Sequence, residues 1–354
     1  MSPSPLIPLP DPIPAPPWVF HVLDVVLFTA HILVINVLLG GTLLFAFSRL
    51  LGRNREHLDP LAGKLPVAFA LGINLGVAPL LFLQVIWGHL FYASSVLMGL
   101  FWILVIPAVI LAYYATYIHA KSHRDVRATF AIVLASLLLL SVGFMLVSNI
   151  LLMMQPEAWG AHFAHREGTL LPLSDPTLIP RYLHYVIASV AVAGLFLSLI
   201  WTIRNRRGTE GADAAIRRGL NVFGYATVVQ AGVGLWFLIA LRRDFLLQFM
   251  GGDPLATAVL GIGFLSGLGA IATALGGKFR PTLAMALITL VAMVITRDQL
   301  RGMYLRGSFD ADALTIHPQY GVLTLFLIIL VAGVASVVWM IRAGFRSGTG
   351  RVPS

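Results

Sequence analysis

Residues 19–48 read VFHVLDVVLFTAHILVINVLLGGTLLFAFS, a long apolar stretch in which Asp24 is the one side chain that is charged at neutral pH. An α-helix needs about 20 predominantly apolar residues to cross the roughly 30 Å hydrocarbon core of a bilayer. The stretch is continuously apolar and shows no alternation of apolar and polar residues, which excludes a membrane-spanning β-strand. It therefore predicts a transmembrane helix.

The rest of the chain repeats this pattern. Similar apolar runs follow at 67–93, 96–119, 128–154, 181–203, 219–241, 255–276, 282–300 and 319–342. Of the 354 residues 58% are hydrophobic and 11% are charged, and the mean hydropathy is +0.88. Soluble domains have about 45–50% apolar and about 25% charged residues. We therefore expect an all-α fold, a polytopic transmembrane bundle of about nine helices, and no large soluble domain.

The positive charges predict the orientation of the bundle. Most of the 24 Lys and Arg residues fall in 49–64, 120–127, 204–218 and 277–281 and in the C-terminal tail. Because cytoplasmic loops retain Lys and Arg, this distribution predicts an N-terminus outside and a C-terminus inside. The net charge of +9 is then explained by membrane topology, and nucleic-acid binding is not expected.

Three segments are expected. Residues 1–18 contain many prolines and neither Lys nor Arg, which predicts an extended extracytoplasmic arm. Residues 19–343 would form the transmembrane bundle, and 344–354 a cytoplasmic tail. Two long outer loops are predicted, at about 155–180 and 298–318, and we expect a partner to bind on that side. Cysteine is absent, which excludes disulfides, iron–sulfur clusters, thiolate zinc sites and covalently attached c-type haem on this chain.

Ionisable side chains within membrane spans are the first candidates for function. His31, His89 and His184 are predicted to lie at a similar depth in the outer half of three different spans. Because a neutral imidazole binds haem iron, three histidines at one depth favour a haem site within the bundle. A hydrogen-bonded structural histidine is the alternative for each. Arg181, three residues before His184, would neutralise a haem propionate, or else extend to the membrane interface.

The other histidines considered fall at the two membrane boundaries, where a solvated or interfacial side chain is expected. They are His57, His119 and His123 on the inner side and His162, His165 and His317 on the outer side.

Several stretches, in the same order along the chain, resemble subunit I of the cytochrome bd quinol oxidases. They are HILVINVLLG at 31–40, NLGVAPLLFLQVIWG at 74–88, MLVSN at 145–149 followed by Gln155-Pro156, and RYLH at 181–184. Asp298 and Arg301 have the spacing of the family's E-Y-G-R. The resemblance implies haem b, with His31 and His184 as ligands, and a multi-pass protein of the bacterial cytoplasmic (inner) membrane.

The chain also departs from this family. The long quinol-binding loop after the sixth helix is reduced to about 242–253. The family's acidic residues at the oxygen-reducing site fall at Gln84, Met98 and Ile106, whose side chains do not titrate near neutral pH. The methionine expected to pair with His184 is missing from 259–264. An oxygen reductase of the usual kind is therefore not expected.

The ligands that would complete the haem sites stay open. Met98 would give a six-coordinate His/Met haem if it lay opposite His31, and otherwise packs as an ordinary methionine. His89 or a partner's residue would face His184. Asp298 would replace the family's haem-ligating glutamate, or form an ion pair with Arg301 or Arg297.

The sequence thus favours a haem b membrane subunit that passes electrons between the quinone pool and an extracytoplasmic redox partner, such as a c-type cytochrome. A quinone is a further expected ligand, and other membrane subunits and the lipid bilayer are expected partners. The alternatives are a haem-free scaffold or transporter subunit and a divergent terminal oxidase. Small-residue faces at Gly40-Gly41, Gly232, Gly234 and 261–269 would allow close helix packing within this chain or against another.

Overall fold

The computed structural model describes residues 6–52, 56–121, 125–164 and 167–347. Within these ranges the fold is all-α, with eleven α-helices. The helices are α1 Pro17–Leu50, α2 Asp59–Ala62, α3 Leu65–Leu97, α4 Gly99–Lys121, α5 Val126–Met153, α6 Leu178–Asn205, α7 Ala212–Ala240, α8 Arg243–Leu247, α9 Pro254–Leu275, α10 Phe279–Leu305 and α11 Tyr320–Ser347. Short helical turns are η1 Pro156–Ala164, η2 Gln248–Gly252 and η3 Ala311–Ala313.

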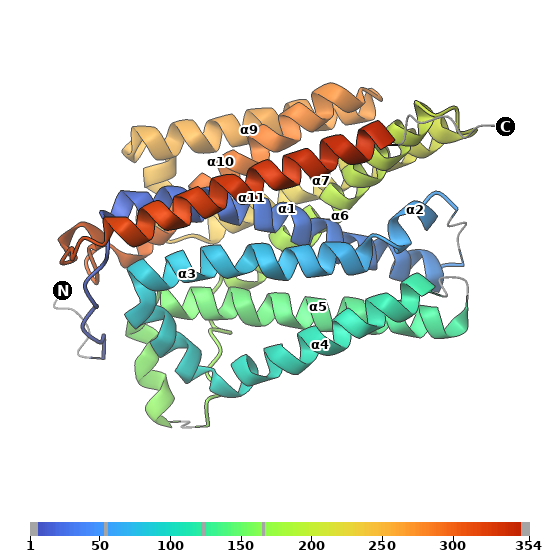
Figure 1. Ribbon diagram of the computed structural model, residues 1–354. Coiled ribbons are helices and arrows are strands. Elements are labelled where there is room, and N and C mark those ends of the chain that lie inside the picture. The colour runs from blue at the N-terminus through green and yellow to red at the C-terminus, as the bar shows by residue number, and fades with distance from the viewer. Residues whose placement is uncertain (1–5, 53–55, 122–124, 165–166, 348–354) are drawn as a thin grey trace.

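Eight of these helices are long and apolar enough to cross a membrane: α1, α3 (taken together with α2), α4, α5, α6, α7, α9 and α10. The long helices run side by side, so that the loops gather at the two ends of the bundle (Figure 1). The prediction of a polytopic helical membrane protein is confirmed at this level. The ninth predicted span is also helical, as α11, and its described apolar part covers Tyr320–Ser336.

Glycine allows the closest helix contacts. A Cβ atom added to Gly40 of α1 would lie 1.9 Å from the Ser189 carbonyl oxygen of α6. Gly194 of α6 also faces Gly219 of α7 closely, since a Cβ on Gly194 would lie 2.9 Å from the Gly219 carbonyl oxygen. Backbones can approach this far only where no side chain intervenes. The small-residue face at Gly40 therefore joins helices of this chain.

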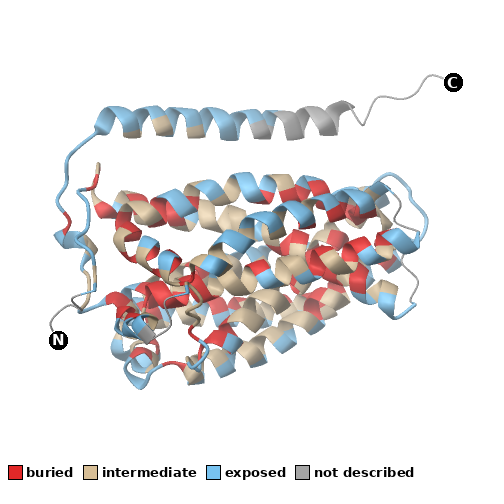
Figure 2. Cartoon of the chain, turned by 90° about the horizontal axis from the view of Figure 1, so that it is seen from below, coloured by how far each residue is buried: buried red, intermediate tan, exposed pale blue. Residues whose placement is uncertain are grey.

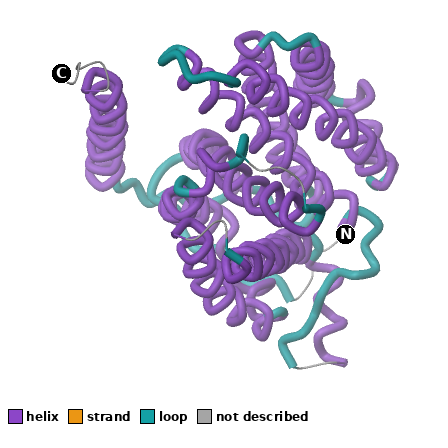
Figure 3. Tube along the Cα trace, turned by 90° about the vertical axis from the view of Figure 1, so that its right-hand side faces the viewer, coloured by secondary structure: helices purple, strands orange, loops and turns teal. Residues whose placement is uncertain are grey.

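Helix α11 lies along the side of the bundle, and most of its described side chains are exposed (Figure 2). Seen along the helix axes, it stands apart from the other long helices (Figure 3). One ring contact joins it to α3, with the Phe326 and Phe82 centroids 5.5 Å apart. Among the described residues, α11 contributes no buried core side chain, and Leu323, Phe326 and Leu330 pack against the edge of the core.

The proline-rich arm is extended and attached to the loop between α10 and α11. The Ile13 amide donates to the Thr315 carbonyl at 2.9 Å, and the His317 amide donates to the Ile13 carbonyl at 2.9 Å. Ile13 is buried. Helix α1 then begins at Pro17, where the missing N–H of proline leaves no backbone group unpaired.

Two predicted boundaries were wrong. The eighth span was expected to end near 300 and to be followed by an outer loop at 298–318, but α10 continues to Leu305. The charged residues that suggested a boundary are paired inside the bundle, so the helix does not end there. The segment expected as a loop at 242–253 contains the short helices α8 and η2.

Candidate functional site

The His31 imidazole lies between α1 and α3. Its Nδ1 donates to the Gly72 carbonyl at 2.9 Å, and because a carbonyl oxygen can only accept, the donor in this bond must be the imidazole N–H. A neutral His31 then carries its lone pair on Nε2. Metal-ligating histidines typically have this arrangement, with one ring nitrogen held by a backbone carbonyl or a carboxylate. Gly76 makes room for the ring, since a Cβ there would lie 2.7 Å from its Cε1.

His184 lies in α6 at a depth similar to that of His31. The two helices run in the same direction and meet where Gly40 touches Ser189. At 1.5 Å per residue, His31 lies about 13 Å and His184 about 8 Å from this contact, both toward the N-terminal ends of their helices. The structure therefore brings these two candidate ligands to within about a helical turn of each other in depth.

Arg181 and His184 share one face of α6, directed at α7. A Cβ on Gly234 of α7 would lie 3.2 Å from the His184 Cε1, and the Arg181 guanidinium lies 4.9 Å from the Phe237 ring centroid. Arg181 is buried and His184 is partly buried. Within the described part of the chain, Arg181 Nε and Nη2 and His184 Nδ1 are buried and have no hydrogen-bond partner.

A buried charge network joins α1 to α10 at the same end of the bundle. The Arg301 Nη1 lies 3.2 Å from the Asp24 Oδ2 and 3.5 Å from the Asp298 Oδ1. His21 lies 3.2 Å from the other Asp298 oxygen. Arg301 also stacks on Trp87 of α3, 4.3 Å from its ring centroid. Of the two roles considered for Asp298, the structure contains the ion pair with Arg301.

The network holds one further unpartnered nitrogen. Arg301 is 1% exposed, and its Nη2 is buried with no hydrogen-bond partner among the described residues. Arg297, one helical turn before it, lies over the Phe28 ring at 3.9 Å. Phe28 in turn contacts His31, with ring centroids 6.1 Å apart. Guanidinium groups thus lie close to both candidate imidazoles.

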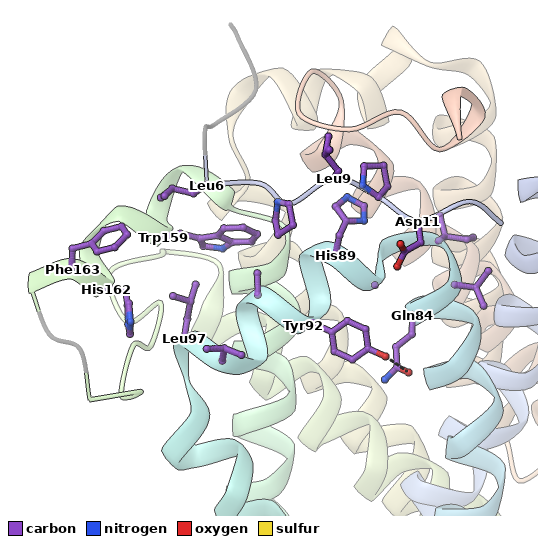
Figure 4. Close-up of a pocket in the computed structure, with 17 residues that line it drawn as sticks. Leu6, Leu9, Asp11, Gln84, His89, Tyr92, Leu97, Trp159, His162 and Phe163 are labelled. Atoms are coloured by element: carbon purple, nitrogen blue, oxygen red, sulfur yellow. Dashed lines mark hydrogen bonds between the residues drawn. The ribbon is translucent and has the colours of Figure 1, made fainter. Parts of the chain in front are cut away.

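Two predicted ligands lie elsewhere. Met98 is buried in the turn between α3 and α4, about 33 Å of helix beyond Gly76, the α3 residue that touches His31. His89 lies on α3, well outward of the Gly76 contact with His31 and beneath the proline-rich arm (Figure 4), and its ring centroid lies 4.7 Å from that of Phe309. Neither faces His31 or His184, because α3 carries both residues past the depth of those rings.

The boundary histidines also differ from expectation. His119 is fully buried, packs on Phe45 with ring centroids 4.6 Å apart, and bonds through Nδ1 to the Ala128 carbonyl at 3.2 Å. It was expected to be interfacial or solvated, but α4 and α5 pack closely enough to cover it. His317 is exposed, while His57 and His162 are partly buried. His123 and His165 lie outside the described residues.

Sequence reasoning missed His21 and the role of Asp24. Both belong to α1, three residues apart, and each meets a residue of α10 that lies 277 positions away in sequence. The signal that could have found them is spacing: His21 and Asp24 are separated by three residues, as are Asp298 and Arg301. Such pairs lie on one helix face and can meet a matching pair on a neighbouring helix.

Among the residues that the structure describes, no three His, Asp or Glu side chains come together as a bare metal site would require. A scan of protein-family models finds no match to the chain. A search of curated proteins finds no match either.

Proposed function

We propose that this chain is a haem b-containing membrane subunit that passes electrons between the quinone pool and an extracytoplasmic redox partner, such as a c-type cytochrome. The observation that carries the proposal is the combination of two imidazoles at a similar depth with buried guanidinium nitrogens that have no hydrogen-bond partner in the described part of the chain. The same proposal places the chain in the bacterial cytoplasmic membrane.

The imidazoles fit axial ligation of haem iron. His31 is held by Gly72 through Nδ1, which leaves Nε2 as the coordinating atom. His184 is partly buried, and its buried Nδ1 has no hydrogen-bond partner among the described residues. Each ring lies against a glycine of the neighbouring helix, Gly76 or Gly234. Glycine permits close approach of the helix backbone at both rings.

The guanidinium groups fit the carboxylates of such a cofactor. A buried donor without an acceptor is unfavourable, so Arg181 Nε and Nη2 and Arg301 Nη2, which have no acceptor among the described residues, favour an anionic ligand. Haem carries two propionates, and arginine binds carboxylates through paired, charge-assisted hydrogen bonds. Asp24 and Asp298 already engage Arg301 on its other side. They would hold this side chain in position for a propionate.

The distribution of charge supports electron exchange on the outer side. His31, His184, Arg181 and the α10 network all lie toward the end of the bundle opposite the basic loops. By the positive-inside rule that end faces away from the cytoplasm. A bound haem would take up and release single electrons, and this chain would supply its ligands, its counter-charges and an apolar enclosure.

Spectroscopy of the full chain, purified in mild detergent after expression with ample haem, tests the proposal. Dithionite-reduced minus oxidised spectra should show b-type bands, and a pyridine haemochrome assay should give the haem stoichiometry. His184→Ala and His31→Ala should each remove haem, while His57→Ala, at the opposite end, should retain the wild-type content.

Three outcomes would change this conclusion. Wild-type protein without a Soret band would overturn the haem proposal and favour a scaffold or transporter subunit. Full haem content in both histidine variants would show that other residues are the ligands. A spectral shift with carbon monoxide would show an open coordination position and return the oxidase alternative.

A further inference from the structure

A cavity of about 560 Å³ lies at the outer end of α3, and neither His31 nor His184 lines it. Its walls are the arm residues 6–11, the outer turns of α3 and the turn η1 (Figure 4). Sites for small organic ligands usually measure about 300–1,000 Å³. From its shape and chemistry we propose that this cavity binds the head group of a quinone or quinol. The proposal rests on the proposed function for the fate of the electrons, whereas binding itself does not require haem.

The cavity is built from anchored elements. Hydrogen bonds from Ile13 and to the Pro14 carbonyl attach the arm to residues 315–319, which holds the roof in place. Trp159 of η1 is 3% exposed, and its Nε1 donates to the Leu152 carbonyl at 2.9 Å. In α3, Trp87 departs from helical geometry (φ −117°, ψ 23°) two residues before His89. Hydrogen bonds therefore connect two walls of the cavity, the arm and η1, to the rest of the chain.

Two imidazole nitrogens are among the polar groups of the cavity walls, together with the side chains of Asp11, Gln84 and Tyr92. His89 Nε2 and His162 Nδ1 are buried, and neither has a hydrogen-bond partner within the part of the chain that is described. Figure 4 shows the two rings on either side of the Trp159 indole. A quinone head group is a flat ring with an oxygen at each end. Each oxygen would meet one imidazole, and the ring would lie against apolar and aromatic side chains.

The charge of the lining separates a quinone from a phospholipid. Among the residues that the structure describes, the lining contains Asp11 and neither Lys nor Arg. A phosphate head group would be repelled by the Asp11 carboxylate and would meet no cation among these described residues. A quinone or quinol is neutral, and hydrogen bonds to its oxygens are sufficient for recognition.

The cavity also continues onto a lipid-facing stripe of α3. Tyr92 and Val96 line it and are 57% and 69% exposed. Val85 lines it one helical turn beyond Leu81, which is 52% exposed. These residues share one face of the helix, so an isoprenoid tail can follow the stripe into the membrane while the head group occupies the cavity.

The test uses the full chain in phosphatidylcholine nanodiscs with ubiquinone-1 as the probe, and binding is followed by quenching of tryptophan fluorescence. His89→Leu removes a hydrogen-bonding atom and should weaken binding about tenfold. His89→Gln keeps a donor and an acceptor and should bind within about threefold of wild type. His317→Leu, the matched control on the same side of the bundle, should bind like wild type, since His317 does not line the cavity.

Two further measurements keep the test decisive if His89→Leu does not fold. Ala93→Trp fills the cavity from α3 and should abolish binding, while an azidoquinone should label the peptides that contain Tyr92 or Trp159. Unchanged binding in both His89→Leu and Ala93→Trp, or labelling confined to 242–253, would overturn the proposal. The proposal would also be overturned if wild-type protein did not bind ubiquinone-1. It would be overturned as well if the cavity held a phospholipid in place of quinone and His89→Leu released that phospholipid.

A reduced spectrum recorded on the same nanodiscs separates this proposal from the haem proposal. Quinone binding without b-type bands would leave the cavity assignment standing and reject the haem. Haem bands without quinone binding would support the haem proposal and reject the cavity assignment.

Discussion

Replacing Gly40 by alanine tests the contact that sets the relative depth of the two candidate imidazoles. An added Cβ would lie 1.9 Å from the Ser189 carbonyl oxygen, 2.3 Å from its carbon and 2.8 Å from the Ala193 Cβ. The first two atoms belong to the α6 backbone, so no rotamer change can remove the clash. Helices α1 and α6 would have to separate by roughly 1.5 Å to restore ordinary carbon contacts.

The cost follows from the packing that this separation removes. Overpacking a well-packed interior usually costs about 1–3 kcal/mol, and an obstacle made of backbone favours the upper end of that range. Alanine has a helix propensity about 1 kcal/mol better than glycine. The net loss for Gly40→Ala is then about 2 kcal/mol. At about 2–4 °C per kcal/mol, Tm should fall by about 4–8 °C.

Thermal unfolding in one detergent, followed by size-exclusion chromatography of heated samples, measures this change. Gly232→Ala is the matched control, because a Cβ on Gly232 meets nothing within 4 Å, and its Tm should stay the same or rise. A Gly40→Ala protein as stable as Gly232→Ala would refute the close α1–α6 contact. It would also remove the basis for placing His31 and His184 at a similar depth.

Three other predictions follow from buried charge. Asp24→Asn removes a partner of the buried Arg301 and should lower the free energy of unfolding by about 3–5 kcal/mol, measured as a lower Tm. The double variant Asp24→Asn with Arg301→Gln should recover most of this loss. An Asp24→Asn protein as stable as wild type would show that the pair is not coupled. Arg181→Leu should lower the midpoint potential of the proposed haem while its b-type spectrum persists, because the positive charge that the variant removes favours the reduced iron. An unchanged potential in a redox titration would place Arg181 away from the cofactor. Burial, and then the positive charge of Arg218, lowers the pKa of His57 below its usual 6.5. Because the folded protein favours neutral His57, the contribution of this residue to stability is fully present above about pH 6.5 and is lost as the pH falls through the lowered pKa. His57→Gln should therefore flatten the fall in Tm between about pH 7 and pH 5. Parallel Tm curves for the variant and the wild type would contradict this assignment.

Much of the helical layout could be predicted from local sequence. The run at 67–93 lies within α3, and the run at 128–154 matches α5 within two residues at each end. The apolar length of a membrane helix is a local property, because each span satisfies its own backbone hydrogen bonds. The prediction was wrong at the end of α10, where Arg297 and Asp298 suggested a boundary. Their partners lie on α1, far away in sequence, and local composition contains no record of them.

In the candidate site, too, some features could be predicted from local sequence and others depended on contacts between helices. The RYLH stretch placed Arg181 and His184 on one helix face by spacing alone, and the structure keeps them together. Met98 and His89 had the right residue types but the wrong depth, because their positions depend on how far α3 extends beyond its contact with His31.

The sequence by itself therefore determined that this is a polytopic helical membrane protein, which side its basic loops favour, and which few side chains could bind a cofactor. Only the tertiary structure decided that His31 and His184 share a depth, that Arg301 is paired with Asp24, and that the arm covers His89. The physical reason is that helix formation in a membrane is set by the hydrophobicity and length of each segment. The register between helices is set by contacts such as that of Gly40 with Ser189, which join residues distant in the chain.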